Sequence, residues 1–466
     1  MTPEELRLHG HEVADWIAGY LEDIRGYPVL PDMRPGDLVD SLPASGPERG
    51  EPMDTILADF RAHIVPALTH WNHPRFFAFF SVSASGPGIL GEMLAAALNV
   101  NGMLWKSCPA ASELEQVTLG WLRDWIGLPP EFFGIIYDTA SISTLHAVAA
   151  ARERADPDAR RRGTRGDLVL YTSEQSHSSI EKAAITLGLG QDNVRHIPVD
   201  NAFRMRVEAL EHAIAADLAA GKRPFCVVAT TGTTSTSSID PVAAIGEVAR
   251  RHNLWLHVDA AYGGSAAVAP DFAWVLAGAA QADSLVINPH KWLFTPIDLS
   301  VLYTRHPEIL RRAFSLVPEY LKTADDPRAI NFMDYGVQLG RRFRSLKLWF
   351  VLRYFGREGI AALIRSHVGY AQRLAALIAA DVRFEVCAPV PLSLVCFRLR
   401  DSDEKNREML DRVNRSGVAF LSHTVLNGKF VLRLAIGNIA TTWEDVAAAW
   451  AVVSDGVYEG RPAKRF

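Results

Sequence analysis

The sequence lacks the features that would mark it as a membrane, secreted or nucleic-acid-binding protein. It has no run of eighteen apolar residues, which excludes a typical transmembrane helix. Its formal net charge is -5 at pH 7, whereas nucleic-acid-binding domains are usually basic. The first five residues, Met1 to Glu5, are polar and acidic and do not resemble a secretory signal, so we expect a cytoplasmic protein.

Metal and disulfide motifs are also missing. His70 and His73 have no cysteine or carboxylate at ligand spacing, so we expect no metal. Four cysteines are present, and their spacings match no zinc motif. We expect these thiols to be reduced core residues; they are Cys108, Cys226, Cys387 and Cys396.

Two common enzyme motifs are absent or incomplete. Ser176-His177-Ser178 places a base between two hydroxyl groups, but the chain has no Gly-x-Ser-x-Gly elbow, so a hydrolase is not favoured. Gly188-Leu189-Gly190 lacks the third glycine of a dinucleotide fingerprint, so hydride transfer is not favoured either.

The composition that is present is that of a soluble globular enzyme. The chain has 466 residues, of which 48% are hydrophobic and 22% charged, enough for two or three structural units. Strand and helix patterns alternate from about Gly134 to Leu302, which predicts an α/β fold with a mostly parallel sheet. From about Gly359 the pattern predicts a small α+β domain. We therefore predict an N-terminal helical segment (1–80), a large domain (81–358) and a small C-terminal domain (359–466).

The stretch from Leu254 to Trp292 contains the most informative residues. Two apolar runs within it end in polar side chains, the first in Asp259 and the second in His290 and Lys291. Buried parallel strands have this appearance. Ligands in open α/β sheets bind outside the carboxyl ends of strands, so the two ends are expected to share one crevice.

A carboxylate and a lysine at neighbouring strand ends suit pyridoxal phosphate. This cofactor needs a lysine amine for its Schiff base and an acidic partner for its pyridine nitrogen. An isolated Asp259–Lys291 ion pair without chemistry is the simpler alternative. Pro289, which fixes the backbone before the lysine, and Ala261, which leaves room for a flat ring, favour the cofactor site.

Two motifs of this stretch carry a family resemblance. Asn288-Pro289-His290-Lys291-Trp292, preceded by His257-Val258-Asp259-Ala260-Ala261-Tyr262, resembles the pyridoxal-phosphate-dependent group II decarboxylases, most closely the aromatic-L-amino-acid decarboxylases. The resemblance implies fold type I of the pyridoxal-phosphate-dependent transferases, a homodimer, and decarboxylation of an aromatic L-amino acid to an amine and carbon dioxide. An aminotransferase on the same fold and a non-catalytic binding protein remain alternatives.

The resemblance also implies which residues bind the cofactor. The turn before the predicted helix at Ala140 and Ser141 would hold the phosphate, and helix N-termini suit anions. Asp138-Thr139 stands where Gly-Ser is common in the family, so the Asp138 side chain is expected to point away from the phosphate. His177 would stack on the cofactor ring. The implied cofactor-binding residues are Ala140, Ser141, His177, Thr234, Asp259, Ala261, Asn288, His290 and Lys291.

The N-terminal region supplies the expected dimer contacts and substrate pocket. Thr2-Pro3-Glu4-Glu5 predicts a helix start, and the following apolar face is rich in aromatic residues. The resemblance implies that this helix packs against a partner subunit. An aromatic cluster from Trp71 to Phe80 is expected to line the substrate site, where the side chains depart from the vertebrate-type pattern at Asn101 and Met103. The pocket candidates are Trp71, Phe79, Phe80, Asn101 and Met103.

The proton donor is the least ordinary feature of the sequence. In the family, a loop before the Gly-Arg-Arg helix carries a tyrosine that protonates the substrate carbon. Counting back without gaps from Gly340-Arg341-Arg342 places Phe332 at that position, within the loop from Asp325 to Gln338, and Tyr335 lies three residues later. Aldehyde synthases of the family also have phenylalanine there and release aldehyde, ammonia and hydrogen peroxide. Decarboxylation to the amine is our first expectation and aldehyde synthesis the second; the catalytic candidates are Lys291, His177, Asp259, Phe332 and Tyr335.

The arginines at the start of this helix predict nearby anions. Arg341, Arg342 and Arg344 lie where the helix dipole disfavours positive charge. We therefore expect acidic or phosphate partners for them.

Overall fold

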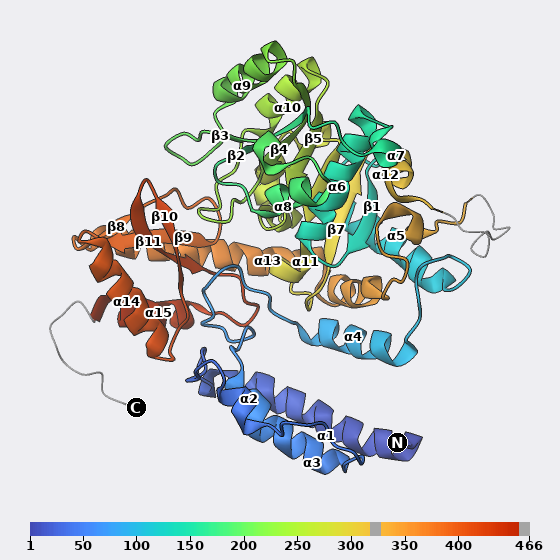
Figure 1. The fold of residues 1–466 in the computed structure, drawn as a ribbon. Helices are drawn as coiled ribbons and strands as arrows, with labels where there is room; N and C mark the ends of the chain where they lie inside the picture. The colour runs from blue at the N-terminus through green and yellow to red at the C-terminus, as the bar shows by residue number, and fades with distance from the viewer. Residues whose placement is uncertain (317–327, 456–466) are drawn as a thin grey trace.

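A seven-stranded sheet forms the centre of the molecule in the computed structural model, which describes residues 1–316 and 328–455 (Figure 1). β7 pairs antiparallel with both neighbours and every other pairing in the sheet is parallel, so the predicted mostly parallel sheet is confirmed. In order across the sheet the strands are β1 (Phe133–Tyr137), β7 (Ser300–Thr304), β6 (Ser284–Ile287), β5 (Trp255–Asp259), β4 (Arg223–Thr230), β2 (Leu168–Ser173) and β3 (Val194–Ile197).

Burial on both faces explains the continuous apolar strand sequences. Every residue of β2, β5, β6 and β7 is buried. Successive side chains of β2 enter different core clusters, with Leu170 in one and Val169 in the other, because strand side chains alternate between the two faces. The helices around this sheet are α5 (Pro109–Trp125), α6 (Ala140–Ala155), α7 (Ala159–Arg162), α8 (Ser179–Thr186), α9 (Val207–Ala219), α10 (Val242–Arg251), α11 (Pro289–Trp292) and α12 (Pro307–Phe314).

A separate antiparallel sheet of four strands forms the C-terminal unit (Figure 1). The long helix α13 (Arg344–Ala380) connects it to the central sheet and bends at Gly356, whose φ of 62° is not helical. The unit contains, in sheet order, β10 (Ser422–Leu426), β11 (Lys429–Ala435), β9 (Leu394–Leu399) and β8 (Phe384–Val386), together with α14 (Asp403–Arg415) and α15 (Trp443–Asp455). The α+β pattern predicted here is confirmed, whereas the exact domain boundaries stay a prediction.

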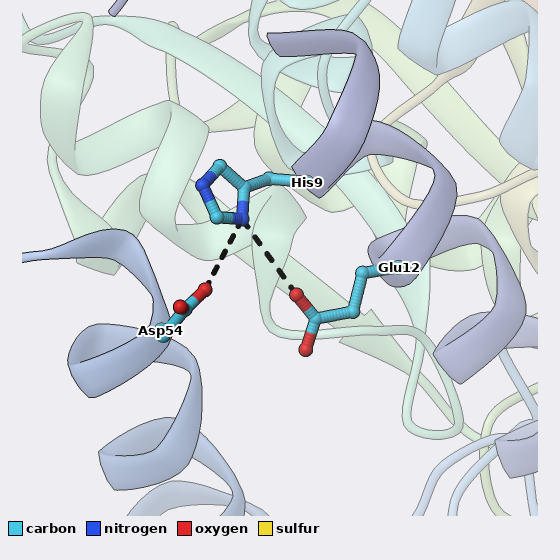
Figure 2. A group of neighbouring side chains, drawn as sticks. All are labelled: His9, Glu12 and Asp54. Atoms are coloured by element: carbon cyan, nitrogen blue, oxygen red, sulfur yellow. Dashed lines mark ion pairs between the residues drawn. The ribbon is translucent and has the colours of Figure 1, made fainter. Parts of the chain in front are cut away.

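The N-terminal helices project from the rest of the chain (Figure 1). α1 (Pro3–Glu22) begins with the predicted capping box, in which Thr2 and Glu5 bind each other's backbone amides. α1 lies beside α3 (Met53–Asp59), and the His9 ring lies between the Glu12 and Asp54 carboxylates at 3.7 and 3.5 Å (Figure 2). α2 (Asp37–Ser41) belongs to the same group, whereas α4 (Gly86–Leu98) packs against α13.

A buried ion pair fixes the segment before α13 to the central sheet. The Arg341 guanidinium lies 2.8 Å from the Glu115 carboxylate of α5, and the two side chains are 8% and 4% exposed. Arg341 also donates to the Ile136 carbonyl, and Glu115 accepts the Ile136 amide hydrogen. Arg342 pairs with Glu92, and Arg344 with Asp298. The expectation of acidic partners for these arginines is therefore confirmed.

Replacing Glu115 with glutamine should destabilise the protein by about 3 kcal/mol, because it leaves the Arg341 charge buried without a carboxylate. Urea unfolding followed by fluorescence measures this loss. The control is Asp271→Asn, which removes an exposed ion pair with Arg365 and should leave the unfolding midpoint nearly unchanged. Equal midpoints for Glu115→Gln and the wild type would show that the buried pair contributes nothing.

Candidate active site

The predicted cofactor residues gather at one edge of the central sheet. They follow the carboxyl ends of parallel strands, where open α/β sheets bind ligands. The strand order places β4, β5 and β6 side by side, so the residues after them are neighbours. Ala140 and Ser141 follow β1, His177 follows β2, Thr234 follows β4, Asp259 and Ala261 are at the end of β5, and Asn288, His290 and Lys291 follow β6.

Asp259 and Lys291 are brought together by strand register. Asp259 pairs with Thr230 of β4 on one side and Val286 of β6 on the other. Its carboxylate is 5% exposed and accepts the Ala261 amide hydrogen at 3.1 Å. Burial lowers the pKa of Lys291, while the negative charge of Asp259 opposes the shift. More of the amine is therefore unprotonated and able to attack an aldehyde than in an exposed lysine.

His177 presents an exposed ring with a defined tautomer. Its Nδ1 accepts the Ser179 amide hydrogen at 3.1 Å, so the neutral ring carries its proton on Nε2. Loss of hydration lowers the pKa of His177, and the charge of Asp259 partly offsets this. A neutral, exposed ring beside Asp259 and Lys291 suits stacking on a flat cofactor.

One end of the buried Asn288 side-chain amide has no hydrogen-bond partner among the described residues. Burial lowers the pKa of His290 to about 3, so its ring is neutral, and its Nδ1 accepts the Leu299 amide hydrogen at 2.9 Å. The proton is then on Nε2, which lies 3.3 Å from the Asn288 side-chain amide and needs the amide oxygen facing it. The other end of the Asn288 amide is buried without a hydrogen bond, which suits a polar ligand group.

The turn between β1 and α6, which the resemblance suggests for the phosphate, ends at the N-terminus of a long helix. Ala140 and Ser141 begin the 16-residue helix α6, whose first amide hydrogens cannot bond within the helix. Thr139 does not cap them with its side chain. The Asp138 carboxylate accepts from the Thr139 amide at 2.5 Å and from the Gln338 side chain at 3.3 Å. Its oxygens are thus held by neighbouring residues.

An aromatic stack forms one wall beside Lys291. Phe80 stacks on Tyr262 at 3.7 Å between ring centroids, and Tyr262 stacks on Trp292 at 4.7 Å. The Lys291 amine lies 5.5 Å from the Phe80 ring centroid. Trp71 and Phe79 stack on each other at 5.9 Å and are partly exposed. Of the five predicted pocket residues, Phe80 therefore lies beside the lysine, and Trp71 and Phe79 form a separate aromatic pair.

The other two pocket candidates, Asn101 and Met103, contact the segment that contains Phe332 and Arg341. Asn101 accepts the Arg341 amide hydrogen at 3.0 Å, and the Met103 carbonyl accepts that of Met333 at 3.1 Å. Phe332 is 2% exposed, and the Arg341 guanidinium lies 4.6 Å from its ring centroid. Arg341 thus contacts both Asn101 and Phe332, and Met103 binds the residue that follows Phe332. Residues 325–327 of the predicted loop lie outside the described residues.

Tyr335 does not face the aromatic wall either. Its ring packs against Phe133 at 5.3 Å, and the charges near its hydroxyl are those of Arg311, Asp334 and Glu308. Burial raises the pKa of Tyr335, which makes its hydroxyl a weaker acid.

Arg433 and Tyr262 are site residues that the sequence reasoning missed. Arg433, on β11, is 3% exposed and donates to the carbonyls of Thr234 at 2.5 Å and Ser235 at 3.0 Å. It therefore ties the C-terminal sheet to the loop after β4. A lone arginine within the apolar run Phe430–Ile436 was the available signal, because an inward-pointing charge needs buried partners.

Histidine clusters elsewhere have structural partners. The His70 ring bonds to the Tyr20 hydroxyl at 2.9 Å, and His73 Nδ1 accepts the Arg75 amide hydrogen at 3.0 Å. His9, Glu12 and Asp54 have their ligand atoms close enough for a metal ion (Figure 2). Arg61 already pairs with Glu12 at 2.6 Å, and Asp54 is exposed, so the group is accounted for as an ion-pair cluster between α1 and α3.

Comparisons with known proteins agree with this geometry. A family model described as the pyridoxal-dependent decarboxylase conserved domain matches residues 35–400. Tryptophan decarboxylase 2 of Oryza sativa subsp. japonica is 40% identical over 474 residues, covering 98% of this chain and 95% of that protein. Phenylacetaldehyde synthase of Arabidopsis thaliana is also 40% identical, over 472 residues, covering 98% and 96%. The crystal structure of Oryza sativa TDC with PLP and tryptamine superposes with a TM-score of 0.94 at 38% identity, covering 98% of both chains.

Replacing Lys291 with alanine should abolish turnover and covalent retention of pyridoxal phosphate. Borohydride reduction of the wild-type holoprotein should fix the cofactor to the peptide that contains Lys291, and peptide mass analysis locates it. Lys222→Ala is the control, because that amine binds the Gly166 carbonyl away from the site, and this variant should label like the wild type. A labelled peptide that persists in Lys291→Ala would identify a different lysine.

Proposed function

The chain belongs to the family of pyridoxal-dependent decarboxylases, and from this premise we propose that it removes the α-carboxylate of an aromatic L-amino acid as carbon dioxide. The placement of Asp259 and Lys291 at neighbouring strand ends, close enough for the carboxylate charge to affect the amine, is the observation that carries this proposal. The aromatic wall at Phe80 beside the lysine supports a flat substrate side chain. The relatives include decarboxylases named for tryptophan and for tyrosine, and both side chains are flat and aromatic.

Each residue of the site has a distinct part in this reaction. Pyridoxal phosphate, when bound, draws the electrons of the breaking bond into its protonated ring. We propose that the Lys291 amine would hold the cofactor through its aldehyde. The Asp259 carboxylate would keep a proton on the ring nitrogen, and the neutral His177 ring would stack on the cofactor and exclude water. The amides of Ala140 and Ser141 would bind the phosphate, and the free end of the Asn288 amide would bind another polar group of the cofactor.

The fate of the carbon that loses carbon dioxide depends on a proton donor. An amine product needs a proton on that carbon, and a positioned acid normally supplies it. Phe332 has no acidic proton, and Tyr335 faces Arg311 and Glu308 with its pKa raised. These observations favour a second candidate function, in which oxygen reacts before a proton arrives. The balanced outcome is one amino acid, one oxygen and one water giving aldehyde, carbon dioxide, ammonia and hydrogen peroxide.

Product analysis distinguishes these functions. The holoprotein is given L-phenylalanine, L-tyrosine, L-tryptophan and L-Dopa in turn, and carbon dioxide, amine, aldehyde, keto acid, oxygen and peroxide are measured. Decarboxylation predicts carbon dioxide with equimolar amine, or with equimolar aldehyde and peroxide. A keto acid without carbon dioxide would identify an aminotransferase and overturn the proposal.

Phe332→Tyr should shift the product toward the amine if the wild type makes aldehyde. A positioned general acid contributes about 10²-fold or more to a proton transfer, so the amine-to-aldehyde ratio should rise by at least about tenfold. Tyr335→Phe is the control and should leave the ratio unchanged. A wild type that yields only amine and does not consume oxygen would refute the aldehyde proposal. In that case we would expect Tyr335→Phe to slow amine formation.

We further propose that the chain acts as a cytoplasmic homodimer, with its N-terminal segment at the interface. No residue of α1 is buried, and Leu6 and Leu8 are 62% and 68% exposed. Apolar surface of this extent favours burial against a partner. Within the described residues, no helix is long and apolar enough to span a membrane.

Deleting residues 1–26 should therefore give an unstable or inactive protein, because α1 would no longer cover the partner. Light scattering reports the mass and product assays the activity. The double variant Leu6→Glu and Leu8→Glu should weaken the dimer, whereas Val382→Glu, at an 87% exposed position remote from α1, should not. A fully active monomer lacking residues 1–26 would refute the proposed interface.

A further inference from the structure

The segment after Phe332 is attached to the junction between β1 and α6. The Tyr137 hydroxyl donates to the Tyr335 carbonyl, and the Val337 amide donates to His146 Nε2 at 3.1 Å. The Gln338 side chain donates to the Asp138 carboxylate at 3.3 Å. Three hydrogen bonds thus hold residues 335–338 against the end of β1 and the first two turns of α6. We call this set of contacts the 137–146 clamp.

His146 is the centre of the clamp and has no part in the reaction described above. It is 0% exposed, and its ring stacks on Tyr137 at 4.2 Å and packs on Phe314 at 4.6 Å between centroids. Its Nδ1 lies 2.6 Å from the Ile142 carbonyl, so Nδ1 carries the proton. Nε2 is then the acceptor that the Val337 amide requires. Burial lowers the pKa of His146 to about 4, which keeps this acceptor available at neutral pH.

Close packing at Gly336 makes the clamp specific. A Cβ atom at residue 336 would lie 2.7 Å from His146 Nε2 and 3.0 Å from the Tyr137 ring. A side chain there would push the backbone away from both rings and break the bond from Val337. The glycine therefore lets the segment lie directly on the stacked Tyr137 and His146 rings.

The clamp connects two parts of the site that matter for the outcome of the reaction. α6 begins at the expected phosphate residues Ala140 and Ser141, and His146 lies on the second turn of that helix. Phe332 lies three residues before Tyr335, and the Arg341 guanidinium, which pairs with Glu115, lies 4.6 Å from its ring centroid. The backbone that follows Phe332 is thus held to α6 and β1, and the Phe332 ring is in contact with the buried ion pair.

We propose that His146, with Tyr137, is a positioning residue that fixes the segment carrying Phe332 to the cofactor-binding helix and so controls how the product divides between amine and aldehyde. The partition of products rests on the proposed function, whereas the attachment of the segment does not. The attachment is made by the side chains of Tyr137, Asp138 and His146.

The test uses the full-length holoprotein and two readouts. His146→Phe keeps a flat ring between Tyr137 and Phe314 and removes the acceptor for the Val337 amide. Hydrogen exchange of the peptide covering residues 332–341 should become at least about tenfold faster, as expected for a lost hydrogen bond that held a local unit closed. The kcat or the amine-to-aldehyde ratio should change by about tenfold with KM within about twofold, because misplacement alters the chemical step more than binding.

Matched variants separate positioning from general loss of stability. His146→Gln offers an amide oxygen near the place of Nε2 and should restore most of the exchange protection. Tyr137→Phe removes the hydroxyl bond to Tyr335 and should speed exchange in the same peptide. Tyr171→Phe is its control, because it removes the hydrogen bond of another buried tyrosine hydroxyl, to Asp217 at 2.9 Å, outside the clamp.

The two proposals fail in different ways. Wild-type exchange at residues 332–341 in both His146→Phe and Tyr137→Phe would overturn the clamp, whatever the reaction is. Faster exchange throughout the protein, equal to that in Tyr171→Phe, would also overturn it. A wild type that does not release carbon dioxide would refute the proposed function, and the exchange data would still decide whether the segment is held. Faster local exchange with unchanged kcat and unchanged product ratio would refute the control of the products.

Discussion

The hydrogen-bonded register between β4, β5 and β6 is the constraint on which the site depends. It places Asp259 opposite Thr230 and Val286, so that the residues after β6 emerge beside the carboxylate. A one-residue slip would turn Asp259 to the opposite face of the sheet, since strand side chains alternate. Complete burial of β5 and β6 makes such a slip costly, because each strand contacts packed helices on both faces. The packing that stabilises the core therefore also fixes the geometry of the site.

Burial also sets the charge state of the basic groups in the site. Loss of hydration lowers the pKa values of Lys291, His177 and His290, and in each case it is the largest cause. The imidazoles are thus neutral and the lysine gives up its proton more readily than in water. A neutral imidazole at His177 can lie flat on a protonated ring without repelling it. The enclosure of the strand ends therefore makes the Lys291 amine easier to deprotonate.

The sequence predicted the parts of the site that depend on local pattern. Asp259 and Lys291 were found because each ends an apolar run, and alternation of strands and helices then implies a shared edge. Arg433, Tyr262 and His146 were missed because their partners are distant in sequence; Arg433 binds residues about 200 positions away. Such contacts leave no periodic signal. Asn101 and Met103 were grouped with Phe80 by resemblance alone, and their grouping stays a prediction; their hydrogen-bond partners include Arg341 and Met333.

The nature of the product is decided by few atoms. A tryptophan decarboxylase and a phenylacetaldehyde synthase are each 40% identical to this chain over nearly its whole length, so overall similarity does not separate the two reactions. Under the proposed function, both candidate reactions release carbon dioxide first. A proton and oxygen then compete for the same carbon, and their relative rates set the outcome. A residue at position 332 influences that competition only if its segment is held in place. Identity at 332 and attachment through His146 and Arg341 are thus two separate requirements, and neither can be inferred from the other.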